Sequence, residues 1–114
     1  MPSLPCLGHM GELLPFHLSR VDTRLPYLET DVQLAKKPSE YFTENFHITT
    51  SGVMATSALL GAVLAIHIDN IMFAIDYPYE STTQAMDFLH GLPLHDTDLH
   101  KIAHGNAERL LRLT

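Results

Sequence analysis

Two short stretches of this 114-residue chain carry side chains that could do acid–base or metal chemistry. The first is GHMGE, residues 8–12, in which His9 and Glu12 stand three positions apart between glycines. An imidazole and a carboxylate at that spacing provide a proton donor and a proton acceptor within reach of each other. The glycines allow the backbone to approach another group closely. A polar turn that leads into a helix is the alternative interpretation of the same five residues.

The second stretch is Asp76, which closes the run IMFAI at residues 71–75. That run is apolar at every position, which is typical of a strand covered on both faces. A carboxylate at the end of such a strand is costly unless a cation or several donors meet it. Asp76 is therefore predicted to be a metal ligand or a catalytic acid. The alternative is a helix cap or turn-former before Pro78.

The elements that must position these residues alternate between strand and helix patterns. Strands are expected at 3–7, 46–50 and 71–75, and helices at 13–25, 55–66, from Ser81 or Thr82 to Leu89, and from 96–98 onward with a division at Gly105-Asn106. Residues 26–45 are expected to form a long, partly helical excursion above the sheet. Alternation of this kind predicts parallel strands and the α/β class. His9 and Asp76 both fall at the carboxyl ends of strands, where parallel α/β sheets carry their chemistry.

Composition limits the classes of partner and of protein. The chain is 46% hydrophobic and 18% charged, which fits one globular domain spanning 1–114. The net charge of −6 disfavours a nucleic-acid or anionic membrane surface and favours small or neutral partners. A single cysteine, Cys6, excludes an internal disulfide, so we expect a buried thiol and a reducing, cytoplasmic location. No signal-peptide pattern is evident, and the longest apolar stretch, 53–66, is shorter than a membrane span needs.

Other short motifs in the sequence give weaker indications of a metal or catalytic site. His100 and His104 stand four apart in HKIAH, a spacing that could bind zinc on one helix face. Lys101 replaces the glutamate of the metallopeptidase motif, so we favour an exposed helix with two histidines. Ser51-Gly52 lacks the arrangement of a hydrolase nucleophile elbow, and no phosphate-binding glycine loop is present.

Five segments together resemble a known family: GHMGE, LPFHLSRVDTRL, YFTENFHITTSG, MFAIDYPYES and KIAHGNAERLL. In this order they are similar to the carboxy-terminal third of the metal-dependent decarboxylases of the amidohydrolase superfamily. These are the γ-resorcylate, dihydroxybenzoate and salicylate decarboxylases, with aminocarboxymuconate-semialdehyde decarboxylase more distant. The resemblance implies the last three βα units of a (β/α)8 barrel. The separation of 67 residues between His9 and Asp76 agrees with two such units of about 31 residues each.

The resemblance also implies roles for four residues. Asp76 would be the metal-binding aspartate of the last strand, and His9 the histidine beside the metal centre, either as a ligand or through water. Glu12 would orient that histidine or relay protons with it, and Arg20 would hold the substrate's carboxylate. The implied cofactor is a divalent ion, zinc or manganese, and the implied substrate is a small aromatic or unsaturated carboxylate. Complete relatives are expected to be homo-oligomers.

Complete members of this family carry further metal ligands on the first strand and near the fifth, and the chain contains neither region. We therefore expect a fragment or truncated product, with an unpaired sheet edge and marginal stability or self-association. Two alternatives to the decarboxylase remain open. One is a hydrolase of the same superfamily, in which the aspartate activates a metal-bound water. The other is a catalytically dead truncated paralogue.

Overall fold

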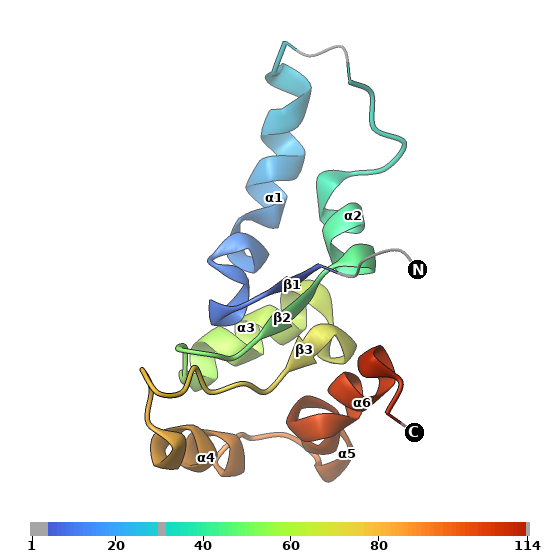
Figure 1. Ribbon diagram of the computed structural model, residues 1–114. Coiled ribbons are helices and arrows are strands. Elements are labelled where there is room, and N and C mark those ends of the chain that lie inside the picture. The colour runs from blue at the N-terminus through green and yellow to red at the C-terminus, as the bar shows by residue number, and fades with distance from the viewer. Residues whose placement is uncertain (1–4, 30–31, 114) are drawn as a thin grey trace.

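Three short parallel strands form one sheet in the order β1-β2-β3 (Figure 1). The computed structural model describes residues 5–29 and 32–113. The strands span Cys6–Leu7 (β1), His47–Thr49 (β2) and Ile71–Met72 (β3). The first two residues of the strand expected at 3–7 lie outside the described residues. The predicted α/β class with a parallel sheet is thus confirmed.

The ladder of β3 ends earlier than predicted because a side chain takes over its hydrogen bonds. The Thr50 hydroxyl donates to the Ala74 carbonyl at 3.0 Å and accepts from the Ala74 amide at 3.1 Å. On its other side, the Phe73 amide donates to the Ile102 carbonyl at 2.9 Å. Beyond Met72 the chain therefore stays extended and anchored, although it no longer pairs backbone to backbone with β2.

One face of the sheet supplies the centre of the core. Leu7, Ile48 and Ile71 are in register across the three strands, and Ile48 and Ile71 are completely buried. Ile71 and Met72 are both buried, as expected for a strand covered on both faces, whereas residues 73–75 are half-buried. The buried residues that pack here include Leu59, Ala62, Ile66, Leu89 and Ile102 from helical segments and Leu92 from the segment after α4.

Two helices project from the sheet as an arm (Figure 1). They are α1, Leu14–Arg24, and α2, Pro38–Asn45, and Asp22 of α1 accepts hydrogen bonds from the backbone and hydroxyl of Ser39 at the start of α2. The partly helical excursion predicted for 26–45 is confirmed. The arm accounts for a radius of gyration of 15.4 Å, against about 13 Å for a compact chain of this length.

Helix α3, Thr56–Ile66, follows β2 and lies against α1. Gly61 makes the close approach possible, because a Cβ there would lie 2.8 Å from Cε1 of Phe16. Helix α4, Thr82–His90, is capped by Ser81, one of the two predicted caps, whose Oγ accepts from the Gln84 amide at 3.2 Å.

The last helical region departs from the prediction. Helix α5, Asp96–His100, continues through a π-helical segment, Lys101–Gly105, into α6, Asn106–Leu111, so Gly105 does not divide it. Two interactions explain the wide turn. The Ile102 carbonyl accepts a hydrogen bond from the backbone amide of Phe73. The buried side-chain amide of Asn106 donates from Nδ2 to the carbonyls of Ile68 and Ile71, both at 2.8 Å. The tertiary contacts with β3 and the residues flanking it thus outweigh the helix-breaking tendency of the glycine.

The expectation that Cys6 is buried is wrong, since its side chain is exposed. Cys6 lies on β1, which forms the outer edge of the described sheet and pairs there with β2 alone. Of the helices that the structure describes, none has the length and apolar character of a membrane span.

Candidate active site

His9 lies in a left-handed turn directly after β1. The turn is closed by the Gly11 amide, which donates to the Gly8 carbonyl at 2.9 Å, and by the Glu12 amide, which donates to the His9 carbonyl at 3.1 Å. Every residue from His9 to Leu13 has a positive φ, between 50° and 79°. Such a conformation costs about 1–2 kcal/mol for each residue other than glycine. Strain of this size persists only where the surrounding structure holds it, and it is common at functional sites.

Packing within the turn provides that support. The Met10 side chain is 1% exposed and belongs to the hydrophobic core. Gly11 admits the neighbouring side chains, because a Cβ there would lie 2.8 Å from Cδ of Pro15 and 3.1 Å from Cγ2 of Ile48. Met10 and Gly11 therefore attach the turn to the hydrophobic core, while His9 and Glu12 remain exposed.

The turn brings His9 and Glu12 together. His9 Nδ1 lies 2.5 Å from Glu12 Oε1, and the two side chains are 48% and 63% exposed. An ionised carboxylate only accepts hydrogen bonds, so Nδ1 is the donor and Nε2 is free to face the other way. The hydrogen bond to Glu12 raises the pKa of His9, with smaller contributions from the charge of Glu12 and from Asp76 against an opposing contribution from burial.

Asp76 reaches the same place from the end of β3. It has a φ of 78°, and its carbonyl accepts from the amides of Tyr79 and Glu80 at 2.9 and 3.0 Å, which forms a turn. Its Oδ2 lies 3.6 Å from His9 Nε2. That distance is too long for a hydrogen bond. Two ligand atoms on one tetrahedral zinc ion lie about 3.4 Å apart, so the pair has the spacing and donor types for a shared divalent ion.

The loop after β2 also contacts His9, a contact that the sequence pattern did not predict. The His9 amide donates to Ser51 Oγ at 3.2 Å, and a Cβ on Gly52 would lie 2.9 Å from His9 Cδ2 and 3.7 Å from Asp76 Oδ2. The available signal was the position of Ser51-Gly52 at the end of the predicted strand 46–50, which puts it at the same edge as His9 and Asp76.

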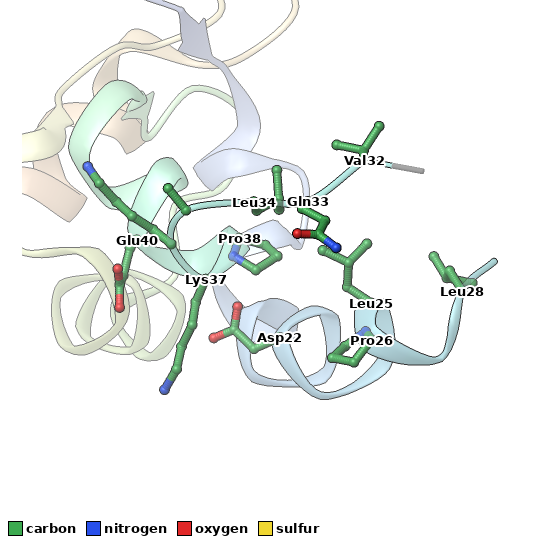
Figure 2. Close-up of a pocket in the computed structure, with 12 residues that line it drawn as sticks. Asp22, Leu25, Pro26, Leu28, Val32, Gln33, Leu34, Lys37, Pro38 and Glu40 are labelled. Carbon is green, nitrogen blue, oxygen red and sulfur yellow. The ribbon is translucent and has the colours of Figure 1, made fainter. Parts of the chain in front are cut away.

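The structure does not bring Arg20 to the site of His9 and Asp76. Arg20 lies in the middle of α1, which rises away from the sheet (Figure 1), and lines a groove of about 480 Å³ with Phe16, Arg24 and Tyr27. A larger cleft, of about 680 Å³, lies between the end of α1 and the segment that precedes α2. Figure 2 shows its apolar wall of Leu25, Leu34 and Pro38 beside the carboxylates of Asp22 and Glu40. None of the four predicted site residues lines this cleft.

The histidines of HKIAH are exposed, as predicted. The rings of His100 and His104 meet edge to face with centroids 3.9 Å apart, and His104 Nδ1 lies 2.7 Å from Glu108 Oε1. Across residues 5–29 and 32–113, no three His, Cys, Asp or Glu side chains converge on a point that could hold a metal ion. The described chain therefore supplies His9 and Asp76 as a pair of donors, one short of the three protein ligands usual for a catalytic zinc.

Comparison with known proteins defines the class. Residues 6–113 match the amidohydrolase family, and the chain belongs to that family. It is 39% identical over 109 residues to the γ-resorcylate decarboxylase of Polaromonas sp. JS666, which covers 94% of this chain and 33% of that protein. The chain therefore spans about a third of the length of the curated relatives it matches.

Solved structures agree with this assignment. The 5-carboxyvanillate decarboxylase of Sphingomonas paucimobilis matches 96% of this chain and 33% of its own, at 42% identity and a TM-score of 0.91. The dihydroxybenzoic acid decarboxylase of Polaromonas sp. JS666, solved with bound manganese and the inhibitor 2-nitroresorcinol, matches 95% of this chain and 33% of its own, at 39% identity and a TM-score of 0.86.

Proposed function

We propose that this chain forms the last three βα units of a (β/α)8 barrel that carries out metal-dependent, non-oxidative decarboxylation of a small aromatic carboxylate. The observation that carries the proposal is the meeting of His9 and Asp76 at the carboxyl end of the sheet, 3.6 Å apart, from strands that are not neighbours. Catalytic groups of barrel enzymes come from the ends of several strands at this face. The relatives that match nearly the whole chain are named as decarboxylases of such acids.

The proposed reaction replaces the ring carboxylate with a proton and releases carbon dioxide. Asp76 holds the proton that is delivered to the ring carbon, and the carbon–carbon bond to the carboxylate then breaks with its electron pair returning to the ring. His9, hydrogen-bonded to Glu12, determines the charge beside Asp76, and the proton that Asp76 delivers is replaced from solvent after each turnover. A divalent ion such as zinc or manganese, when held by His9 and Asp76 with ligands from the rest of the barrel, polarises the carboxylate and an adjacent ring hydroxyl.

Arg20 keeps its proposed role as the group that holds the substrate's carboxylate, since a guanidinium matches a carboxylate in two parallel hydrogen bonds. Arg20 lies on α1, away from His9 and Asp76, so it cannot hold a substrate at that pair within the described chain. The groove of Arg20 and Arg24 must face a site supplied by another subunit or by the remainder of the barrel. We also propose a homo-oligomer for the complete protein, as the resemblance implies. The free cysteine fits a reducing compartment such as the cytoplasm.

A hybrid barrel tests the function directly. The part of the Polaromonas γ-resorcylate decarboxylase that precedes the matched region is fused to this chain, which then supplies the last third. We expect the hybrid to bind manganese and to release carbon dioxide from γ-resorcylate. The variant Asp76→Asn is expected to lose at least a hundredfold in kcat, whereas Asp87→Asn on the exposed face of α4 serves as the matched control and keeps the activity.

The same hybrid separates the alternatives. Hydrolysis of an ester or lactone without release of carbon dioxide would favour the hydrolase. A folded hybrid that holds no zinc or manganese after loading would favour a catalytically dead paralogue.

A further inference from the structure

The turn after β2 binds the backbone of His9 and lies beside the carboxylate of Asp76. β2 lies between β1 and β3, so its carboxyl end separates the two strands that carry these residues. For His9 Nε2 and Asp76 Oδ2 to approach within 3.6 Å, the turn after β2 must leave the space between them open. Ser51 and Gly52 stand at that point.

Ser51 binds the backbone of His9. The His9 amide donates to Ser51 Oγ at 3.2 Å, and Ser51 Oγ lies 2.8 Å from Thr49 Oγ1, so the hydroxyl is oriented from two sides. Gly8 allows this approach, because a Cβ on Gly8 would lie 3.1 Å from Ser51 Oγ. The first residue of the left-handed turn is thus attached to the end of β2 through one side-chain hydroxyl.

Gly52 leaves room for the ring of His9. With a φ of 72°, Gly52 adopts a conformation that other residues rarely take. A Cβ at this position would lie 2.9 Å from His9 Cδ2, closer than real Cβ contacts, and 3.7 Å from Asp76 Oδ2. Any side chain would therefore displace the imidazole from its place beside Asp76.

We propose that Ser51 and Gly52 are positioning residues for His9, Ser51 by holding its backbone amide and Gly52 by leaving the space in which its ring meets Asp76. This inference rests on the proposed function for its catalytic meaning. The contacts do not build the core, because His9 remains 48% exposed and Ser51 and Gly52 are half-buried. They fix the placement of one ring at the candidate metal site.

The test uses the chain itself with the variants Gly52→Ala, Ser51→Ala and Ser51→Thr. Gly91→Ala is the matched control, because Gly91 follows α4 with a negative φ, and a Cβ there meets backbone oxygens of α4 and no site residue. The first measurement is the nuclear Overhauser effect between the Gly52 α-protons and the His9 ring proton Hδ2. The second is the dissociation constant for Mn²⁺, measured by electron paramagnetic resonance.

We expect the Overhauser contact in the unmodified chain and in the Gly91→Ala and Ser51→Thr variants. It should be lost or weakened in Ser51→Ala. In Gly52→Ala the His9 ring resonances should shift because the ring is displaced. Mn²⁺ binding should weaken at least tenfold in Gly52→Ala and Ser51→Ala, as for other groups that orient metal ligands, and should recover in Ser51→Thr.

Unchanged ring contacts and an unchanged Mn²⁺ dissociation constant in both Gly52→Ala and Ser51→Ala would overturn the inference. If Gly52→Ala does not fold, the comparison of Ser51→Ala with Ser51→Thr decides it. If the unmodified chain binds no Mn²⁺, the metal site of the proposed function fails in the isolated chain. The positioning of His9 is then still decided by the Overhauser contact, so the two failures are distinguishable.

Discussion

His9 Nε2 lies 3.6 Å from Asp76 Oδ2, although the two residues follow strands at opposite edges of the described sheet. Both reach across the end of β2 from backbone conformations with positive φ, 50° for His9 and 78° for Asp76. The strain is concentrated where the chemistry is proposed and is held by neighbouring contacts. This distribution is expected of a preorganised site more than of a simple surface turn.

The pKa of His9 is expected to depend more on Glu12 than on Asp76. Its hydrogen bond to Glu12 is the largest cause of the raised pKa, and the contributions of Asp76 are smaller. Glu12→Gln should therefore lower the pKa of His9 more than Asp76→Asn does, as measured by following the His9 ring protons by NMR against pH. Because the folded pKa is raised, the stabilisation from this pair is complete below the ordinary histidine pKa and is lost as the pH rises through the folded value.

Glu108→Gln is the matched control for this titration. It removes the carboxylate of a different His–Glu pair, His104–Glu108, in which the distance is 2.7 Å. It should leave the pKa of His9 where it was. An equal fall in all three variants would contradict the assignment of the shift to Glu12.

The sequence predicts those parts of the fold that local patterns determine. The apolar run at 71–75, the alanine- and leucine-rich run at 55–66 and the Ser81 cap predict a strand and two helices that the structure contains. The extent of β3 and the continuity of the last helix were not predictable in this way. They depend on the Thr50 hydroxyl and on the Asn106 amide, which bond residues that are 24 and 35 or more positions away.

The residues of the candidate site also fall into those that local sequence patterns predict and those that they do not. The residue types and strand ends point to His9, Glu12 and Asp76, and the structure brings their side chains together. Gly52 carries no polar side chain, so no chemical signal marked it, and its importance is visible only once the ring of His9 is placed against it. The position of Arg20 followed from the direction of α1, which no local pattern encodes.

Acid is expected to destabilise the chain through His47. Nδ1 of His47 is buried and, among the described residues, has no hydrogen-bond partner. Burial lowers the pKa of His47, with a smaller contribution from Arg109. The unfolded chain therefore takes up a proton at a higher pH than the folded chain, so stability falls as the pH drops below the ordinary histidine pKa.

Urea unfolding of the chain and of His47→Gln at pH 7.5 and pH 5 tests this prediction. The loss of unfolding free energy on acidification should be smaller in the variant, which has no titrating ring at this position. A loss of equal size in both proteins would show that other groups cause the acid sensitivity.

Asn106 is expected to be the main polar attachment of the C-terminal helices to β3. Its side chain is completely buried, and its amide donates to the carbonyls of Ile68 and Ile71 at 2.8 Å. Asn106→Ala leaves these carbonyls without that donor, which should cost about 1–3 kcal/mol of unfolding free energy in urea titrations. Asn45→Ala is the matched control. It removes an exposed amide that donates to the Tyr41 carbonyl, and it should cost about 0.5 kcal/mol or less.

The isolated chain is expected to self-associate through β1. In the described sheet, β1 pairs with β2 alone, and Cys6 on it is exposed, so its outer edge is available for another strand. Apolar side chains near this end of the chain are also exposed, including Leu13 at 66% and Phe16 at 46%. Cys6→Lys places a charge on the edge, which opposes strand pairing between chains.

Size-exclusion chromatography with light scattering should show dimers or larger species for the unmodified chain and a shift toward monomer for Cys6→Lys. Leu113→Lys, which adds the same charge at an exposed position after α6, should not shift the distribution. A stable, monodisperse monomer of the unmodified chain would contradict the prediction that the edge of β1 is open to pairing.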